Sequence, residues 1–283
     1  MDTQRGLFGW SRGMTYTGYL ELTVEKKYNR SVISNSFFDG VLKITRPTYL
    51  PEGLPLLTLI HVGGGYVDGD SYKTEVVVGE GAKLALTTQA STKIYKSLQF
   101  GVRQEMDYFL QAGSELLVKQ DPLIAYKDAQ FSQVTNVYME QTSIFYYTDI
   151  ITPGWSEDGK LFQYKNISSK LKLFIDGELQ VFDHQLLMPG ENLQKLMQLE
   201  GYTHIGTLFM IHPQVDENLI EKIRVELRSV NHSRFGISAL SAKGLSMRAL
   251  AFSTPEIEEV FSVCEEVIRH HLENKEKIEW RKW

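Results

Sequence analysis

The sequence lacks several features that mark secreted, membrane and metal-finger proteins. Its single cysteine, Cys264, rules out an internal disulfide and any paired-cysteine metal motif. No apolar stretch approaches the roughly 20 residues of a membrane span, and residues 1–19 lack the apolar core of a signal peptide. We therefore expect a cytoplasmic protein that has no membrane partner.

An excess of positive charge is also missing. The chain carries 30 lysines and arginines against 35 aspartates and glutamates, which gives a formal net charge of -5. Non-specific binding to nucleic acid depends on clustered cationic side chains. The composition therefore argues against a nucleic-acid partner.

Recognisable catalytic and nucleotide-binding motifs are absent as well. The glycine-rich segment His61–Asp70 lacks the Lys-Ser/Thr of a phosphate loop and the glycine spacing of a dinucleotide site. The seven histidines have no metal-finger spacing, although a surface histidine that binds nickel loosely stays an open alternative. No nucleophile signature stands out. We expect no enzyme, no catalytic residues and no firm metal site.

Alternating apolar residues predict β-strands in the first two thirds of the chain. The alternation recurs in residues 16–24, 41–45, 72–78 and 84–86. Residues 54–62 instead form a nearly continuous apolar run, which predicts a strand buried on both faces.

One internal similarity bears on the architecture. Residues 78–86 resemble residues 110–118: an apolar residue enters a glycine-containing turn, a small residue follows, and alternate aliphatic residues leave it. Repetition of this kind favours stacked coils of a β-helix, although two unrelated hairpins could look the same.

The last third of the sequence predicts helices. Helical spacing of apolar residues occurs at Glu191–Leu199 and at Asp216–Arg228. A third helix begins near Ser253, which is followed by Pro255 and Glu256 as in a capped helix start. We therefore predict a mainly β fold, with a β-helix-like body of stacked strands and a few C-terminal α-helices. It forms one domain: β-rich at about 1–190, helix-containing at about 190–273, and a charged tail at 274–283.

Two segments hold the candidate polar residues. Asp68 and Asp70 fit a tight turn in which their carboxylates accept backbone amides, or alternatively the paired carboxylates of a glycosidase. In Thr87–Tyr95, hydroxyls, an amide and Lys93 could form an anion or metal-water pocket, or could pair across a sheet.

The order of these segments resembles a known family signature. Gly-Gly-Gly-Tyr-Val-Asp-Gly-Asp at 63–70, Gly81-Ala82 and Thr-Thr-Gln-Ala-Ser-Thr-Lys-Ile-Tyr at 87–95 are similar to the UreD (UreH) family of urease accessory proteins. The similarity extends from about Tyr16 to the final helix. It departs at Gly154-Trp155, where the family commonly has Gly-Arg.

The resemblance implies a β-helical adaptor without a tightly bound cofactor. Such a protein is expected to bind UreF, through it the GTPase UreG, and apo-urease, and to let nickel pass toward the urease active site during GTP-dependent insertion. The partner-binding residues are unknown at this point. The signature residues expected to line the passage or shape the fold are Gly64, Gly65, Asp68, Asp70, Thr87, Thr88, Gln89, Lys93 and Tyr95. The alternatives are a β-solenoid carbohydrate-active enzyme that uses Asp68 and Asp70, and a sugar-binding module.

Overall fold

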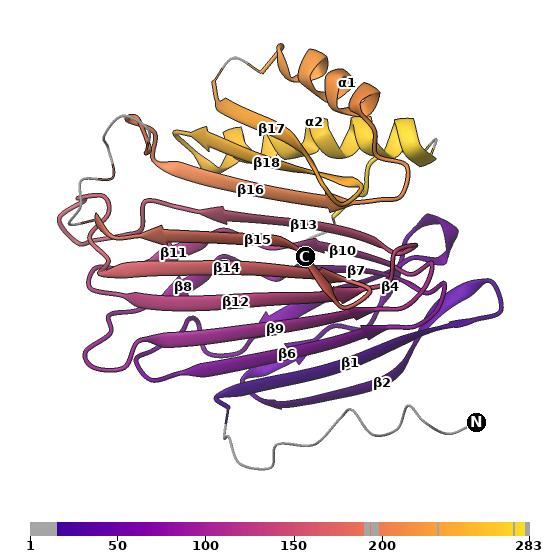
Figure 1. The fold of residues 1–283 in the computed structure, drawn as a ribbon. Coiled ribbons are helices and arrows are strands. Elements are labelled where there is room, and N and C mark those ends of the chain that lie inside the picture. Colours follow the sequence, from indigo (N-terminus) through magenta and orange to yellow (C-terminus); the bar gives the residue numbers. More distant parts are fainter. Residues whose placement is uncertain (1–15, 190–192, 194–197, 231, 274, 281–283) are drawn as a thin grey trace.

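Two stacked β-sheets form the body of the protein in the computed structural model, which describes residues 16–189, 193, 198–230, 232–273 and 275–280. We name the seven-stranded sheet that faces the viewer in Figure 1 the front sheet and the 11-stranded sheet behind it the back sheet. The front sheet contains, in spatial order, β15 (Glu178–Leu187), β14 (Asn166–Ile175), β12 (Gln130–Met139), β9 (Val102–Leu110), β6 (Ser71–Val78), β1 (Gly18–Lys27) and β2 (Arg30–Gly40).

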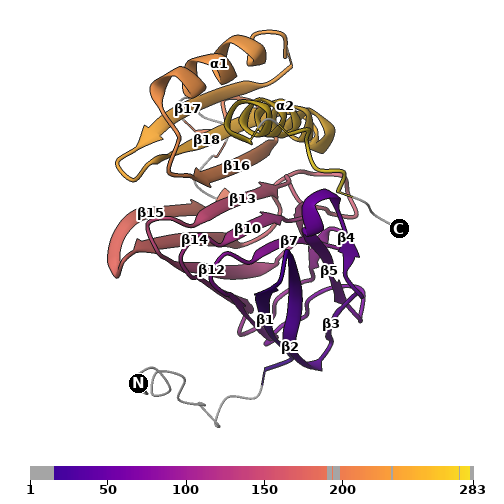
Figure 2. The same ribbon diagram turned by 90° about the vertical axis from the view of Figure 1, so that its right-hand side faces the viewer.

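The back sheet extends further than the front sheet. Its main order is β17 (Arg234–Leu240), β18 (Gly244–Ala251), β16 (His204–Ile211), β13 (Ile144–Ile151), β10 (Glu115–Lys119), β7 (Lys83–Thr88), β5 (Pro55–His61) and β3 (Leu42–Ile44). The short strands β4 (Thr48–Tyr49), β8 (Thr92–Ile94) and β11 (Leu123–Ala125) pair beside this path, and a 3-10 turn, η1 (Pro51–Gly53), precedes β5. Figure 2 shows the two sheets edge-on as separate layers.

The chain coils between the sheets, and successive coils stack in parallel register. β6, β9 and β12 each cross the front sheet and continue as β7, β10 and β13 in the back sheet. Val78 lies opposite Leu110, and Leu84 opposite Leu116, so the two similar segments occupy equivalent places in neighbouring coils. The N–H of Gly81 donates to the carbonyl of Ala112 at 2.9 Å and joins the two turns. The prediction of a β-helix-like body is confirmed.

Two apolar clusters fill the space between the sheets, and a third lies on the outer face of the back sheet. Leu57 on β5 belongs to a cluster between the sheets, whereas its neighbour Leu56 belongs to the outer cluster. β5 is therefore buried on both faces along this part, as its continuous apolar run predicts.

Two helices cover the outer cluster. α1 (Glu217–Leu227) is capped by Asp216, whose carboxylate accepts the N–H of Leu219 at 2.8 Å, and α2 (Thr254–Glu273) follows β18. Both were predicted from helical spacing. The predicted helix Glu191–Leu199 lies largely outside the described residues. None of the described helices is both long and apolar enough to cross a membrane.

Close packing of α2 on β16 gives a first prediction. A Cβ added at Gly206 would lie 2.4 Å from Ile257 and 2.7 Å from Phe261, both on α2. Gly206→Ala is therefore expected to lower the free energy of unfolding by about 1–3 kcal/mol through overpacking. Gly236→Ala, on the same sheet, has no atom within 4 Å of the new Cβ and serves as the control. Urea unfolding of both variants measures the difference; equal losses would contradict the packing argument.

Candidate functional site

A layer of polar side chains crosses the interior between the two apolar clusters. In the front sheet, Gln104 lies beside Gln133, Gln133 beside Ser169, and Ser169 beside Gln185, so one inward row passes through four neighbouring strands. Gln133 and Ser169 are almost fully buried, and the Gln133 amide donates to the Ser169 hydroxyl at 2.7 Å. Inward positions of a β-helix are normally apolar, because buried polar groups need partners.

The back sheet supplies the partners of this row. The Gln133 amide also donates to Oδ2 of Asp149 on β13 at 3.2 Å, and the Gln185 amide donates to the Thr207 hydroxyl at 2.9 Å. Arg248 on β18 donates to Thr207 and to Oδ1 of Asp183, the latter at 2.8 Å. The polar layer therefore joins the two sheets and ends at the ion pair between Arg248 of β18 and Asp183 of β15.

Asp149 is the most strongly perturbed carboxyl group of the layer. Its burial raises its pKa to about 6, although the nearby charge of Arg248 acts in the opposite direction. Oδ1 of Asp149 is buried without a hydrogen-bond partner among the described residues. A carboxyl group with this pKa changes its protonation state close to neutral pH.

Cavities adjoin the layer on the side of the signature segments. One of about 280 Å³ lies between the sheets, and a smaller one of about 10 Å³ touches Asp149 and Gln133. Gln104 and Gln120 line both. Because about 10–15 Å³ holds one water molecule, the larger cavity holds several.

The larger cavity reaches the surface at the signature residues. Gly64, Gln89 and Lys93 are exposed and line it, together with Gly65, Thr87 and Thr88. A Cβ at Gly65 would lie 2.6 Å from the ring of Tyr95, and the Tyr95 hydroxyl donates to the carbonyl of Gly64 at 3.2 Å. The glycines therefore allow the two signature segments to pack against each other.

Asp68 and Asp70 do not line either cavity. Asp68 accepts the backbone N–H groups of residues 99, 100 and 101 at 2.8–3.0 Å. Although desolvation raises its pKa, these donors together lower it below the ordinary value. Asp70 accepts the N–H of Val67 at 2.8 Å and the hydroxyls of Thr17 and Tyr72. Both aspartates hold turns together, which leaves neither as the free acid of a glycosidase.

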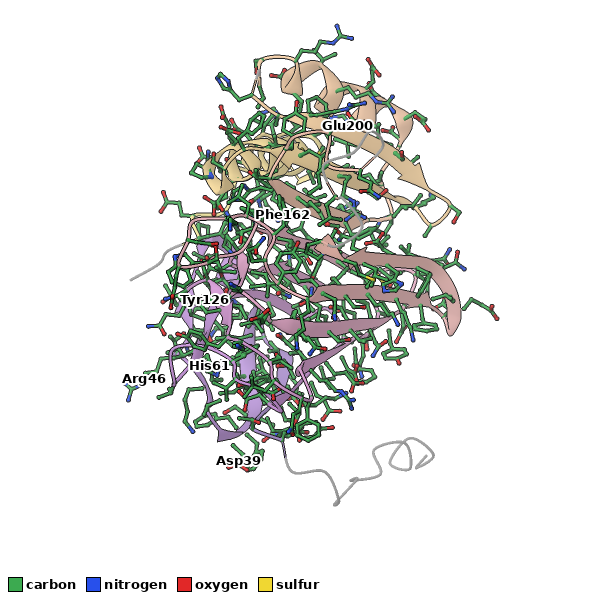
Figure 3. All side chains as sticks on the ribbon, turned by 90° about the vertical axis from the view of Figure 1, so that its left-hand side faces the viewer. Asp39, Arg46, His61, Tyr126, Phe162 and Glu200 are labelled. Atoms are coloured by element: carbon green, nitrogen blue, oxygen red, sulfur yellow. The ribbon has the colours of Figure 1, made fainter. Side chains whose placement is uncertain are left out.

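His61 connects Asp70 to the cavity. The Tyr72 hydroxyl donates to Oδ2 of Asp70 at 2.6 Å and lies 3.2 Å from Nε2 of His61, and both rings line the cavity. Burial lowers the pKa of His61, so its imidazole is neutral near pH 7. Figure 3 shows His61, Tyr126 and Phe162 following one another along this loop-bearing end of the coils.

The signature therefore locates the cavity entrance but not the polar layer. Gly64, Gly65, Thr87, Thr88, Gln89 and Lys93 meet at the cavity, whereas Asp68, Asp70 and Tyr95 support it from outside. The layer residues Gln104, Gln133, Asp149 and Arg248 were missed. Their only signal is a polar residue at an inward position of an alternating strand. The described residues hold no group of three histidine, cysteine, aspartate or glutamate side chains placed to bind a metal ion.

Comparison with known proteins identifies the family of this chain. The family model described as UreD urease accessory protein matches residues 16–283. A urease accessory protein UreD of Bacillus sp. strain TB-90 is 45% identical over 271 residues, which cover 95% of this chain and 100% of the relative. Proteins of the same name from Lachnoclostridium phytofermentans and Bacillus cereus are 38% and 33% identical, and cover 90% and 94% of this chain and 94% and 98% of their own lengths.

The fold defines a β-solenoid with a polar layer through its interior. The chain belongs to the UreD family of urease accessory proteins, as the resemblance in its signature segments predicts.

The raised pKa of Asp149 gives a second prediction. The folded protein keeps the proton to about pH 6, whereas the unfolded chain loses it near pH 4. This group therefore contributes stability below about pH 4, and the contribution is lost as the pH rises through about 6. Asp149→Asn removes the cost of burying the charge, which is on the order of 3 kcal/mol at most.

We expect Asp149→Asn to be more stable than the wild type at about pH 7.5, with the difference vanishing near pH 4. Urea unfolding across this range measures it. Lower stability of the variant at about pH 7.5 would mean that Arg248 and Gln133 more than offset the burial of the carboxylate.

Proposed function

We propose that this chain is a non-catalytic scaffold of urease maturation that acts in the cytoplasm. It binds apo-urease and UreF, and through UreF the GTPase UreG, and it lets nickel pass during GTP-dependent insertion. Family membership supports the accessory role. The polar layer through the interior is the single observation that carries the passage.

The fold does not need a polar layer for its stability, because apolar residues of the same volume stabilise a core at least as well. Retaining Gln133, Ser169 and Asp149 at inward positions therefore requires another reason. Transit of a hydrated cation supplies one, since an ion needs oxygen ligands to replace water wherever it moves.

The ligand types suit transit better than storage. Amide and hydroxyl oxygens along the layer bind nickel weakly, and only two carboxylates of the described residues, those of Asp121 and Asp149, line the narrow section. A strong site would need several histidine or carboxylate ligands, and such a site would hold the ion. The section at Asp149 is narrow, about 10 Å³, so the surrounding glutamine side chains must move as the ion passes.

The third prediction tests the passage. The chain is co-expressed with the urease subunits and the other accessory proteins, and the nickel content and activity of the purified urease are measured. Asp149→Asn and Gln133→Leu are expected to assemble normally but to lower nickel loading by about tenfold, because the first removes a charged carboxylate and the second an amide oxygen from the narrow section. Asp176→Asn, at an exposed hairpin turn, is the control.

Each component of the proposal can fail separately. If the wild-type chain does not co-purify with urease or the accessory proteins, the scaffold role is wrong. If Asp149→Asn and Gln133→Leu assemble and load nickel fully, the scaffold role stands and the route through the polar layer is wrong.

A further inference from the structure

The front sheet ends at β15, but the back sheet continues past it. β15 pairs only with β14 among the described residues, whereas β16, β18 and β17 extend the back sheet. Figure 1 shows these three strands above β15, and Figure 2 shows α2 on the side away from the front sheet. The described front sheet therefore lacks a strand that would cover β18 and β17.

Three small residues lie together on the inward face of β17 and β18. Gly236 pairs with Arg248 and Ser238 with Ser246, which places these four residues on one face, and the Arg248 side chain reaches Asp183 of β15. Arg234, at one end of this face, forms an ion pair with Glu200. Gly236 and Ser238 are exposed, and a Cβ at Gly236 would meet nothing within 4 Å. Ile237, on the opposite face, is buried in the cluster under the helices. A larger side chain therefore fits over Gly236.

The backbone of β15 presents open hydrogen-bonding groups at this edge. The N–H of Asp176 donates to Met139 of β12, so the backbone groups of even-numbered β14 residues point toward β12. Lys170 is one of them, and it lies directly opposite His184. In an antiparallel pair, the backbone N–H and C=O groups of two opposite residues either point toward each other or all point away. The backbone groups of Phe182, His184 and Leu186 therefore face the open edge.

The side chains along this edge are apolar and basic. Phe182 and Leu186 are 58% and 51% exposed. Lys172 lies opposite Phe182 and Lys170 opposite His184, and neither lysine has a carboxylate within ion-pair distance among the described residues. A local positive surface on a chain of net charge -5 is complementary to an acidic partner.

We propose that β15 receives an extended acidic segment of a partner protein, which adds as the next strand of the front sheet. Its backbone pairs with that of Phe182, His184 and Leu186. Its outward acidic residues reach Lys170 and Lys172, and its inward apolar residues cover the small residues of β17 and β18. This inference rests on the proposed assembly with urease and the other accessory proteins, which supply the segment.

A proline at His184 tests the strand addition. Proline removes one N–H, and edge strands tolerate it where that N–H faces solvent. We expect His184→Pro to lower recovery of the co-expressed complex by at least about tenfold, as loss of an edge hydrogen bond and a steric block predict. His184→Ala keeps the N–H and is expected to assemble normally.

Ser36→Pro is the matched proline control. Ser36 is on β2, the other edge strand of the front sheet, and lies opposite Leu22 of β1. By the same alternation, its backbone N–H and C=O groups point away from β1. It is expected to leave assembly unchanged. Thermal unfolding of each purified variant shows whether the prolines cost similar stability.

Hydrogen exchange on the wild-type complex locates the contact directly. The amides of residues 182, 184 and 186 are expected to become protected on assembly, and the double variant Lys170→Glu/Lys172→Glu is expected to weaken assembly.

Assembly with unprotected amides, or normal assembly of His184→Pro, overturns the inference while leaving the scaffold role intact. A dimer of the chain alone that His184→Pro abolishes would assign the edge to a second copy and also overturn it. Failure of the wild type to assemble at all would remove the proposed function itself.

Discussion

In-register stacking of the coils is the constraint on which the rest of this structure depends. Parallel strands pair residue for residue, so an inward side chain of one coil lies beside the inward side chain of the next. A polar residue placed inward has hydrogen-bonding groups that another polar residue or a water molecule must satisfy. Gln104, Gln133 and Ser169 therefore occur as a row. Asp149 and Thr207 of the opposite sheet accept hydrogen bonds from glutamine side chains of the front sheet. The same rule keeps the apolar clusters on either side continuous.

The C-terminal third departs from this rule, and the departures give the molecule its asymmetry. β15 and β16 pair antiparallel to their neighbours, which ends the coiling. The helices then cover only the outer face of the extended back sheet, and among the described residues no strand pairs with the second edge of β15. The polar layer ends at the Arg248–Asp183 ion pair beside that edge. In the described part of the chain, the polar layer and the unpaired edge of β15 thus meet in one region.

Much of the fold could be predicted from local sequence. Alternation predicted strands such as β6, apolar spacing predicted α1 and, together with a cap, α2, and the repeated glycine turns predicted stacked coils. The residues at the cavity entrance could also be predicted, because its glycines and hydroxyls lie in two short segments. The polar layer was not, because Gln133 and Asp149 are unremarkable within their own strands. Their place in the layer depends on hydrogen-bond partners that are 16 to 36 residues away in the chain.

By itself, the sequence determined the local conformations: glycines that allow left-handed turns, alternation that gives each strand an inner face, and caps that begin helices. These depend on interactions within a few residues. Only the tertiary structure decided which inward polar residues meet, that burial raises the pKa of Asp149, and that Asp68 and Asp70 accept hydrogen bonds within turns. It also decided that β15 pairs on one side only among the described residues. These properties depend on register and on where each sheet ends, and both are set by long-range pairing that no short segment encodes.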